Sequence, residues 1–189
     1  MVPQPGDRAG AEALVRQAEL EAGVEVTRRR VLEMCARSAA PLGRASLPDH
    51  LTASAVVVDG DRGALLLRHR KLGRWLQPGG HVDDDGNLLA AAVREATEET
   101  GLSDLVAVLP AIDVDVHDVH YPDGSFHVHH DVRFLLLVGS DLVPAPNHES
   151  TGHRWARTDV DLDGLDVDVS TRRLVRRGLA VAASMPLRR

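Results

Sequence analysis

The segment between Asn87 and Gly101 constrains the fold of this chain most strongly, because both of its ends are marked. Asparagine is a residue type that caps helix N-termini, and glycine commonly ends helices in the left-handed conformation. The apolar positions between them recur at helical spacing. The sequence therefore predicts a helix from Leu88 to about Thr100, with one face packed against the rest of the protein.

The face next to this apolar stripe carries three carboxylates. At about 100° per residue, Glu99 falls about 40° to one side of Glu95 and Glu98 about 60° to the other. Like charges at these spacings destabilise a helix by a few tenths of a kcal/mol per pair, and Arg94 alone cannot neutralise three acids. Two explanations are open: a solvated acidic face, or a site for a hard divalent cation such as Mg²⁺, which also carries phosphate-bearing substrates.

Segments typical of strands lie on both sides of the predicted helix. Residues 51–60 and 63–70 are apolar runs joined by a tight turn, residues 105–119 and 126–139 flank the turn "YPDGS", and 153–157 is a short candidate. Ser170 is expected to cap a final helix that runs to about Ala183.

The N-terminal part of the chain differs from the rest. The first ten residues lack periodicity and are expected to form a flexible tail, while Ala11 to about Ala39 predicts two helices with a break near Gly23. A linker rich in Pro and Gly follows. We therefore divide the chain into an N-terminal helical extension, residues 1–47, and a catalytic domain, residues 48–189. The extension is expected to cover one face of the domain or to support a homodimer.

Composition excludes several classes of protein. A chain of 189 residues with a net charge of −6 and no basic stripe is not expected to bind a nucleic acid polymer. Its one cysteine, Cys35, excludes an internal disulfide and a Cys-rich zinc site, and it fits a reducing compartment. No run approaches the roughly 18 apolar residues of a membrane span. We expect a cytoplasmic protein with no membrane partner.

Residues 80–102 resemble the signature of the Nudix hydrolases, the Nudix box. That signature is Gly, five residues, Glu, seven residues, then Arg-Glu-aliphatic-any-Glu-Glu-any-Gly-aliphatic. The matching residues here are Gly80, Arg94, Glu95, Ala96, Glu98, Glu99, Gly101 and Leu102, and the preceding "WLQPGGH" is also similar to the family's usual approach to the box. So many fixed positions make this motif far more specific than a lone glycine pattern.

The resemblance implies a fold and a set of roles. It implies an α/β/α sandwich around a mixed β-sheet, with Mg²⁺, or alternatively Mn²⁺, bound at the box. Glu95 and Glu99 would be the principal metal ligands, and Glu98 a further ligand or a water-activating group. Arg94 would orient these acids, and Gly80 would offer its carbonyl. The implied reaction is hydrolysis of a nucleoside diphosphate linked to another moiety.

One signature position departs from the family's pattern. Gly86 stands where the box has its first Glu, and Asp85 stands where a Gly is usual. Asp83, Asp84 or Asp85 can substitute for the missing Glu only if the loop bends to bring one of them in. We expect the loss to weaken one metal position rather than to abolish binding. It also keeps open the alternative of a nucleotide-sensing Nudix module that does not hydrolyse its ligand.

A further acid lies outside the box. Glu149 precedes Trp155 by six residues, on a segment in which Pro and Gly indicate a loop. In several branches of the family, an acid in such a place closes over the metals and acts as base. The resemblance therefore makes Glu149 a candidate general base, and an ordinary exposed glutamate is the alternative.

The remaining candidates are basic residues. Five histidines, His117, His120, His127, His129 and His130, cluster around the second predicted strand pair. Strand parity places His129, Asp131 and Arg133 on one face and the apolar residues on the other, which is expected to be the core. We favour surface positions or contact with substrate, by His129, Asp131 or Arg133, over zinc binding, because cysteines and tight spacing are lacking. Arg70, at a strand end, either binds phosphate or is a solvated charge.

Overall fold

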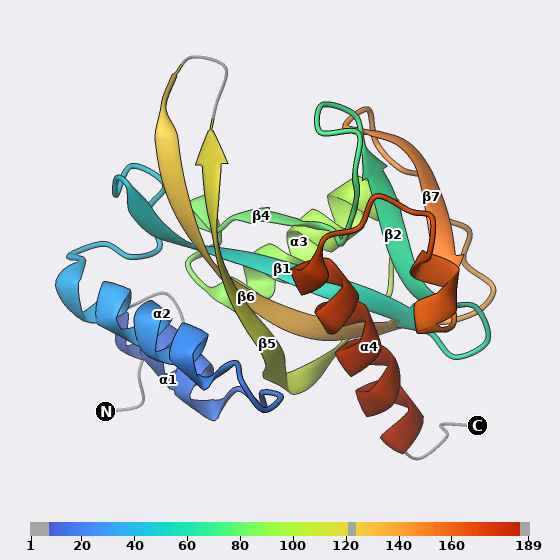
Figure 1. Cartoon of the computed structure of the whole chain (residues 1–189), viewed down its shortest axis with the longest axis horizontal. Helices are drawn as coiled ribbons and strands as arrows, with labels where there is room; N and C mark the ends of the chain where they lie inside the picture. The colour runs from blue at the N-terminus through green and yellow to red at the C-terminus, as the bar shows by residue number, and fades with distance from the viewer. Residues whose placement is uncertain (1–7, 121–123, 186–189) are drawn as a thin grey trace.

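The computed structural model describes residues 8–120 and 124–185 (Figure 1). The helices are α1 (Arg8–Gln17), α2 (Glu25–Arg37), α3 (Leu88–Thr100) and α4 (Val169–Ser184), with 3₁₀ turns η1 (Asp83–Asp85) and η2 (Asp159–Leu162). The strands are β1 (Asp49–Asp59), β2 (Gly63–His69), β3 (Trp75–Leu76), β4 (Gly79–His81), β5 (Val106–His120), β6 (Phe126–Val138) and β7 (Ser150–Ala156).

The seven strands form one mixed sheet. Its order is β3-β2-β1-β6-β5, with β4 paired to β1 and β7 paired to β2. β1 runs parallel to β6 along the whole length of β1, from Asp49 opposite Val128 to Asp59 opposite Val138. The other pairings are antiparallel. The parallel pair matters for function because it brings the start of β1 beside the start of β6, which lie far apart in the chain.

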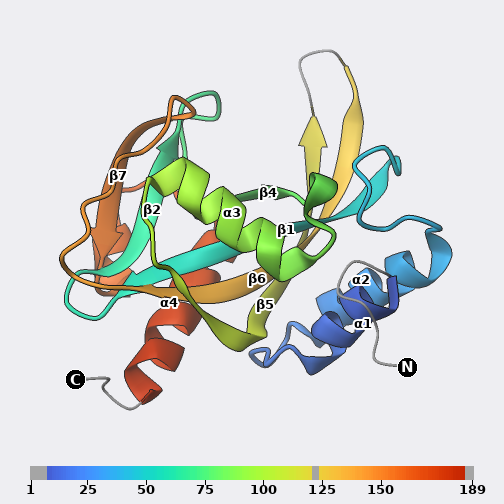
Figure 2. The ribbon, with the colours of Figure 1, turned by 180° about the vertical axis from the view of Figure 1, so that it is seen from behind.

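Helices cover both faces of the sheet, with α4 in front in Figure 1 and α3 in front in Figure 2. The alanine face of α3 joins one core with Ala53, Ala55 and Val57 of β1. α4 packs Leu174 and Val175 on the other face. The alternation of side chains along β1 thus serves two cores. The structure confirms the predicted α/β/α sandwich around a mixed sheet.

The N-terminal helices pack at the β5 side of the sheet. Val15 of α1 and Met34 of α2 are buried in the same core as α3, and the Glu19 amide donates to the Ala111 carbonyl at 2.8 Å. Cys35 is fully buried there, and this burial raises the pKa of its thiol to about 12. Helix α1 already begins at Arg8, so residues 8–10 are helical and not part of a tail, and the rest of the predicted tail lies outside the described residues. The division at residues 47 and 48 stays a prediction.

Local signals predicted α3 well and α4 less well. The Asn87 side chain accepts from the Ala90 amide at 2.8 Å, and Gly101 ends α3 with a φ of 69°. By contrast, the cap of α4 is Asp168, which accepts from the Thr171 amide at 2.7 Å, so the assignment to Ser170 was wrong. Ser170 lies inside the first turn and donates to Asp168, which has the extended backbone that a cap requires.

Two further outcomes concern the strands and the membrane. The short strand predicted at 153–157 exists as β7 and begins earlier, at Ser150. The predicted turn at 121–125 lies partly outside the described residues. Within the described part of the chain, none of the helices has the length and apolar character needed to cross a lipid bilayer.

Candidate active site

The candidate active site is built where β4 meets the acidic face of α3. A Cβ atom on Gly80 would stand 2.6 Å from Glu95 Oε1, and one on Gly79 would overlap the side chain of Ser54 in β1. Both positions therefore lack room for a side chain. Because Gly80 has none, the Glu95 carboxylate lies directly against the backbone of β4. The Gly79 amide also donates to Glu99 Oε1 at 3.4 Å.

The carboxylates of α3 carry more negative charge than the neighbouring cations neutralise. Burial raises the pKa of Glu99 to about 8; the Gly79 amide partly offsets this, and the charges of Glu95, Glu149 and Glu98 add to it. Burial also raises the pKa of Glu95, which Arg94 moderates. A nearby cation would favour the ionised form of both acids. The donor atoms are all oxygens, the ligand type that Mg²⁺ and Mn²⁺ prefer.

Arg94 ties the box loop to the helix. Its guanidinium lies 2.7 Å from Asp85 Oδ2, 2.9 Å from Glu95 Oε1 and 3.3 Å from Glu98 Oε2. It also donates to the His81 carbonyl at 3.0 Å. One arginine therefore fixes the orientation of two helix carboxylates and of the strand that carries Gly80.

Gly86 stands where the box has its first Glu, and the backbone conformation at this position favours glycine. Gly86 ends η1 with a φ of 70°, in the left-handed region, where a side chain costs about 1 kcal/mol or more. The loop nevertheless bends toward the helix, because Asp85 meets Arg94 and the charge of Asp83 acts on Glu95. A loop carboxylate is thus present beside the box, one residue before its usual place.

The loop that carries Glu149 is held against the same site. The backbone amide of Arg70 donates to the Glu149 carbonyl at 2.7 Å, and its side chain donates to the carbonyls of His148 at 2.7 Å and Ser150 at 3.3 Å. The charge of Glu149 contributes to the raised pKa of Glu99, so the two acids lie near each other. Arg70 therefore holds this loop in place by binding the carbonyl groups of the loop backbone.

Arg133 occupies a different environment from the box residues. It is 2% exposed and lies 2.8 Å from Asp131, 3.2 Å from Asp115 and 3.4 Å from Asp113. It also donates to Ser170 of α4. The apolar face of β6 belongs to the core, as predicted. The opposite face, which carries Arg133, is buried as well, because α4 covers it.

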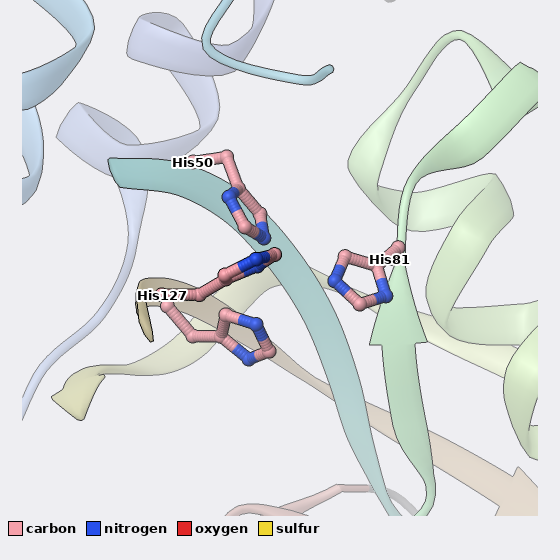
Figure 3. A group of neighbouring side chains, drawn as sticks. His50, His81 and His127 are labelled. Atoms are coloured by element: carbon pink, nitrogen blue, oxygen red, sulfur yellow. The ribbon is translucent and has the colours of Figure 1, made fainter. Parts of the chain in front are cut away.

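His129 lies on this same face, farther toward the start of β6. Its register partner on β1 is His50, and the two rings are 4.9 Å apart. His81 of β4 and His127 lie beside them (Figure 3). Sequence reasoning did not connect His50 and His81 with His129, because only the pairing of β1 with β6 and β4 brings the three together.

The comparisons with known proteins agree with this geometry. A family model described as the NUDIX domain matches residues 48–166, which is more than half of the chain. The chain belongs to the Nudix family. A Homo sapiens relative, the m7GpppN-mRNA hydrolase NUDT17, is 27% identical over 127 residues, which are 58% of this chain and 38% of that protein. The chain thus spans well under half the length of this relative.

Solved structures are similar in fold. A hydrolase of the NUDIX family from Clostridium perfringens has a TM-score of 0.61 and 24% identity, covering 70% of this chain and 97% of that one. The C. elegans Ap4A hydrolase in a binary complex has a TM-score of 0.58 and 20% identity, covering 71% and 98%. At such identities the similarity establishes the fold, and the chemistry must be argued from the site.

Proposed function

We propose that this protein catalyses the Mg²⁺-dependent hydrolysis of a diphosphate bond in a nucleoside diphosphate linked to another moiety. The observation that carries the proposal is the acidic face of α3 against the Gly79–Gly80 backbone. There, burial and neighbouring acids raise the pKa of Glu99 to about 8. A solvated acidic face would not crowd its carboxylates into such a place, since burying charge without a partner is costly.

The donors fit a hard divalent cation. Glu95 and Glu99, with the Gly80 carbonyl, would hold Mg²⁺, and Glu98 would be a further ligand. All of these donors are oxygens, and the glycine at position 80 leaves the space that the Glu95 carboxylate needs. When bound, such a cation polarises phosphoryl oxygens and neutralises charge on the leaving phosphate.

The protein's own residues position the groups and move the proton. A water molecule attacks phosphorus, and the bond from phosphorus to the bridging oxygen breaks. We assign removal of the water's proton to Glu149, because Glu98, the other candidate, is already paired with Arg94 at 3.3 Å. Arg94 orients Glu95 and Glu98, and Arg70 holds the Glu149 loop in place.

The substrate class in this proposal is a small nucleotide. The name of one similar protein, an Ap4A hydrolase, supports it, and that of another, an m7GpppN-mRNA hydrolase, supports action on a nucleotide-containing compound. The alternative, a nucleotide sensor without hydrolysis, is favoured by Gly86. The contact between Asp85 and Arg94 counts against it, because a loop carboxylate still meets the box arginine. A cytoplasmic location and a homodimer also remain proposals.

The test is a screen of ADP-ribose, dinucleoside polyphosphates and sugar nucleotides with Mg²⁺ or Mn²⁺, scored by product mass. We expect cleavage at a diphosphate bond, loss of most turnover in Glu99→Gln, and a larger loss in Glu149→Gln than in Glu98→Gln. Tight binding of one compound without cleavage would favour the sensor. Metal-dependent turnover that is unchanged in Glu99→Gln would refute the assignment.

A further inference from the structure

Four histidines from three strands surround one point on the sheet face opposite the box carboxylates. His50 of β1, His81 of β4, and His127 and His129 of β6 each offer a ring nitrogen, and these nitrogens all lie within 4.8 Å of one another. In Figure 3 the rings of His50, His81 and His127 turn toward a common space. Ring centroids of His50 and His81 are 5.1 Å apart, and those of His81 and His129 are 5.0 Å apart.

Several nitrogens of this group lack hydrogen bonds. The Nε2 atoms of His50, His81 and His129 are buried and have no partner among the described residues. A buried polar atom without a partner costs about 1–3 kcal/mol. The Nδ1 atom of His50 lies 3.3 Å from the Ser46 carbonyl, which holds the hydrogen on Nδ1 and leaves the lone pair on Nε2. The group is therefore arranged for a ligand that accepts lone pairs.

We propose that His50, His81, His127 and His129 form a zinc site with four imidazole ligands, separate from the carboxylate site of the box. Zinc prefers four tetrahedral ligands at about 2.0–2.1 Å, and sites in which protein fills all four positions are structural. The nitrogens are slightly farther apart than bound ligands would be, so small side-chain rotations close the site. Mg²⁺ and Ca²⁺ do not fit, because no carboxylate belongs to the group.

An anion is the competing occupant, and it needs protonated rings. Burial lowers the pKa of His50 to about 4 and that of His129 to about 3, and the neighbouring imidazoles add to both effects. Four rings at about 5 Å would repel one another if charged. The neutral form is the one that binds a metal.

The site would act on the box through His81. This residue follows Gly80 directly, and its carbonyl accepts from Arg94 at 3.0 Å. Its side chain points to the histidine group while its backbone borders the carboxylates. Zinc would thus tie β4 to β1 and β6 and hold the box backbone from the far face of the sheet, which is a positioning role.

The first experiment uses the full chain. Protein stripped with a chelator and desalted is incubated with Zn²⁺, desalted again and analysed for metal content, in wild type and in Glu99→Gln. We expect about one tightly held zinc in both proteins, and a zinc K-edge absorption spectrum with imidazole nitrogen as the nearest shell. No retained zinc, an oxygen-dominated shell, or loss of zinc in Glu99→Gln would each overturn the proposal.

The second experiment compares variants. His50→Gln and His129→Gln should each weaken zinc binding at least about tenfold, while His153→Gln, an exposed histidine on β7, should bind like wild type. Circular dichroism verifies that each variant is folded. Zinc binding that is equal in His129→Gln and His153→Gln would refute the site. If a variant fails to fold, the spectrum of the wild type still decides the question.

Discussion

Replacing Glu99 with Gln should stabilise the metal-free protein while it removes activity. Burial and neighbouring acids raise the pKa of this carboxyl from 4.5 to about 8 in the folded chain. A raised pKa means that the folded state prefers the protonated acid. Its favourable contribution is therefore complete below pH 4.5 and is lost as the pH rises through about 8. Glutamine is neutral at every pH, and it can still accept from the Gly79 amide.

The magnitude follows from the pKa change. At about 1.4 kcal/mol per pKa unit, the step from 4.5 to about 8 corresponds to a ceiling of about 5 kcal/mol. Structural relaxation and water penetration lower such ceilings, so we expect Glu99→Gln to be about 2–4 kcal/mol more stable than wild type at pH 9. For a chain of this size, that is a rise in Tm of about 5–15 °C. At pH 5 the difference should fall below about 1 kcal/mol, because the folded carboxyl is then protonated and the unfolded one is only partly ionised.

Thermal unfolding with a chelator, followed by circular dichroism from pH 5 to 9, measures this effect. Glu98→Gln is the matched control, because the Glu98 side chain is 57% exposed and pairs with Arg94 at the surface. The free energy of unfolding of this control should differ from that of wild type by no more than about 0.5 kcal/mol at any pH. The reasoning fails if Glu99→Gln is no more stable than wild type at pH 9, or if its gain is the same at every pH.

Three further variants or probes test other parts of the structure. Arg133→Met should lower the free energy of unfolding by about 3–5 kcal/mol in urea titrations, because it leaves the buried Asp131 carboxylate without a cation. Arg172→Met removes a more exposed pair and should cost less than about 1 kcal/mol, so similar losses in the two variants would contradict a buried network. Gly80→Ala should weaken Mg²⁺ binding at least about tenfold in calorimetric titrations, because its Cβ displaces the Glu95 carboxylate, and unchanged affinity would argue against Glu95 as a ligand. Cys35 should resist a thiol reagent at pH 8 in the folded protein and react fully in urea, because burial raises its pKa to about 12; fast labelling of the folded protein would show that the N-terminal helices open.

Features encoded within one segment were predictable from the sequence. The ends of α3, its packed face and its acidic face all follow from residues within one helix, where spacing determines direction. Five of the seven strands also follow from local runs, whereas the short strands β3 and β4 were not predicted. The choice between Asp168 and Ser170 as the cap of α4 did not, because both residue types cap helices and the backbone angles decide.

Features that depend on pairing between distant segments were not predictable. Strand parity placed Arg133 away from the core, but parity cannot tell that α4 covers that face and supplies Ser170 as a partner. The meeting of His50 with His129 depends on the parallel register of β1 and β6, which no local pattern encodes. The role of Arg70 was also hidden, since its partners are carbonyl groups in a loop far along the chain.

The way in which Arg70 holds the Glu149 loop has a consequence for how this protein can change. Its side chain binds the carbonyls of His148 and Ser150, and carbonyls are present whatever the side chains at those positions. The residues on either side of Glu149 can therefore be replaced without releasing the acid from its place. The site could acquire new substrate preferences by mutation of this loop while its reaction chemistry is preserved.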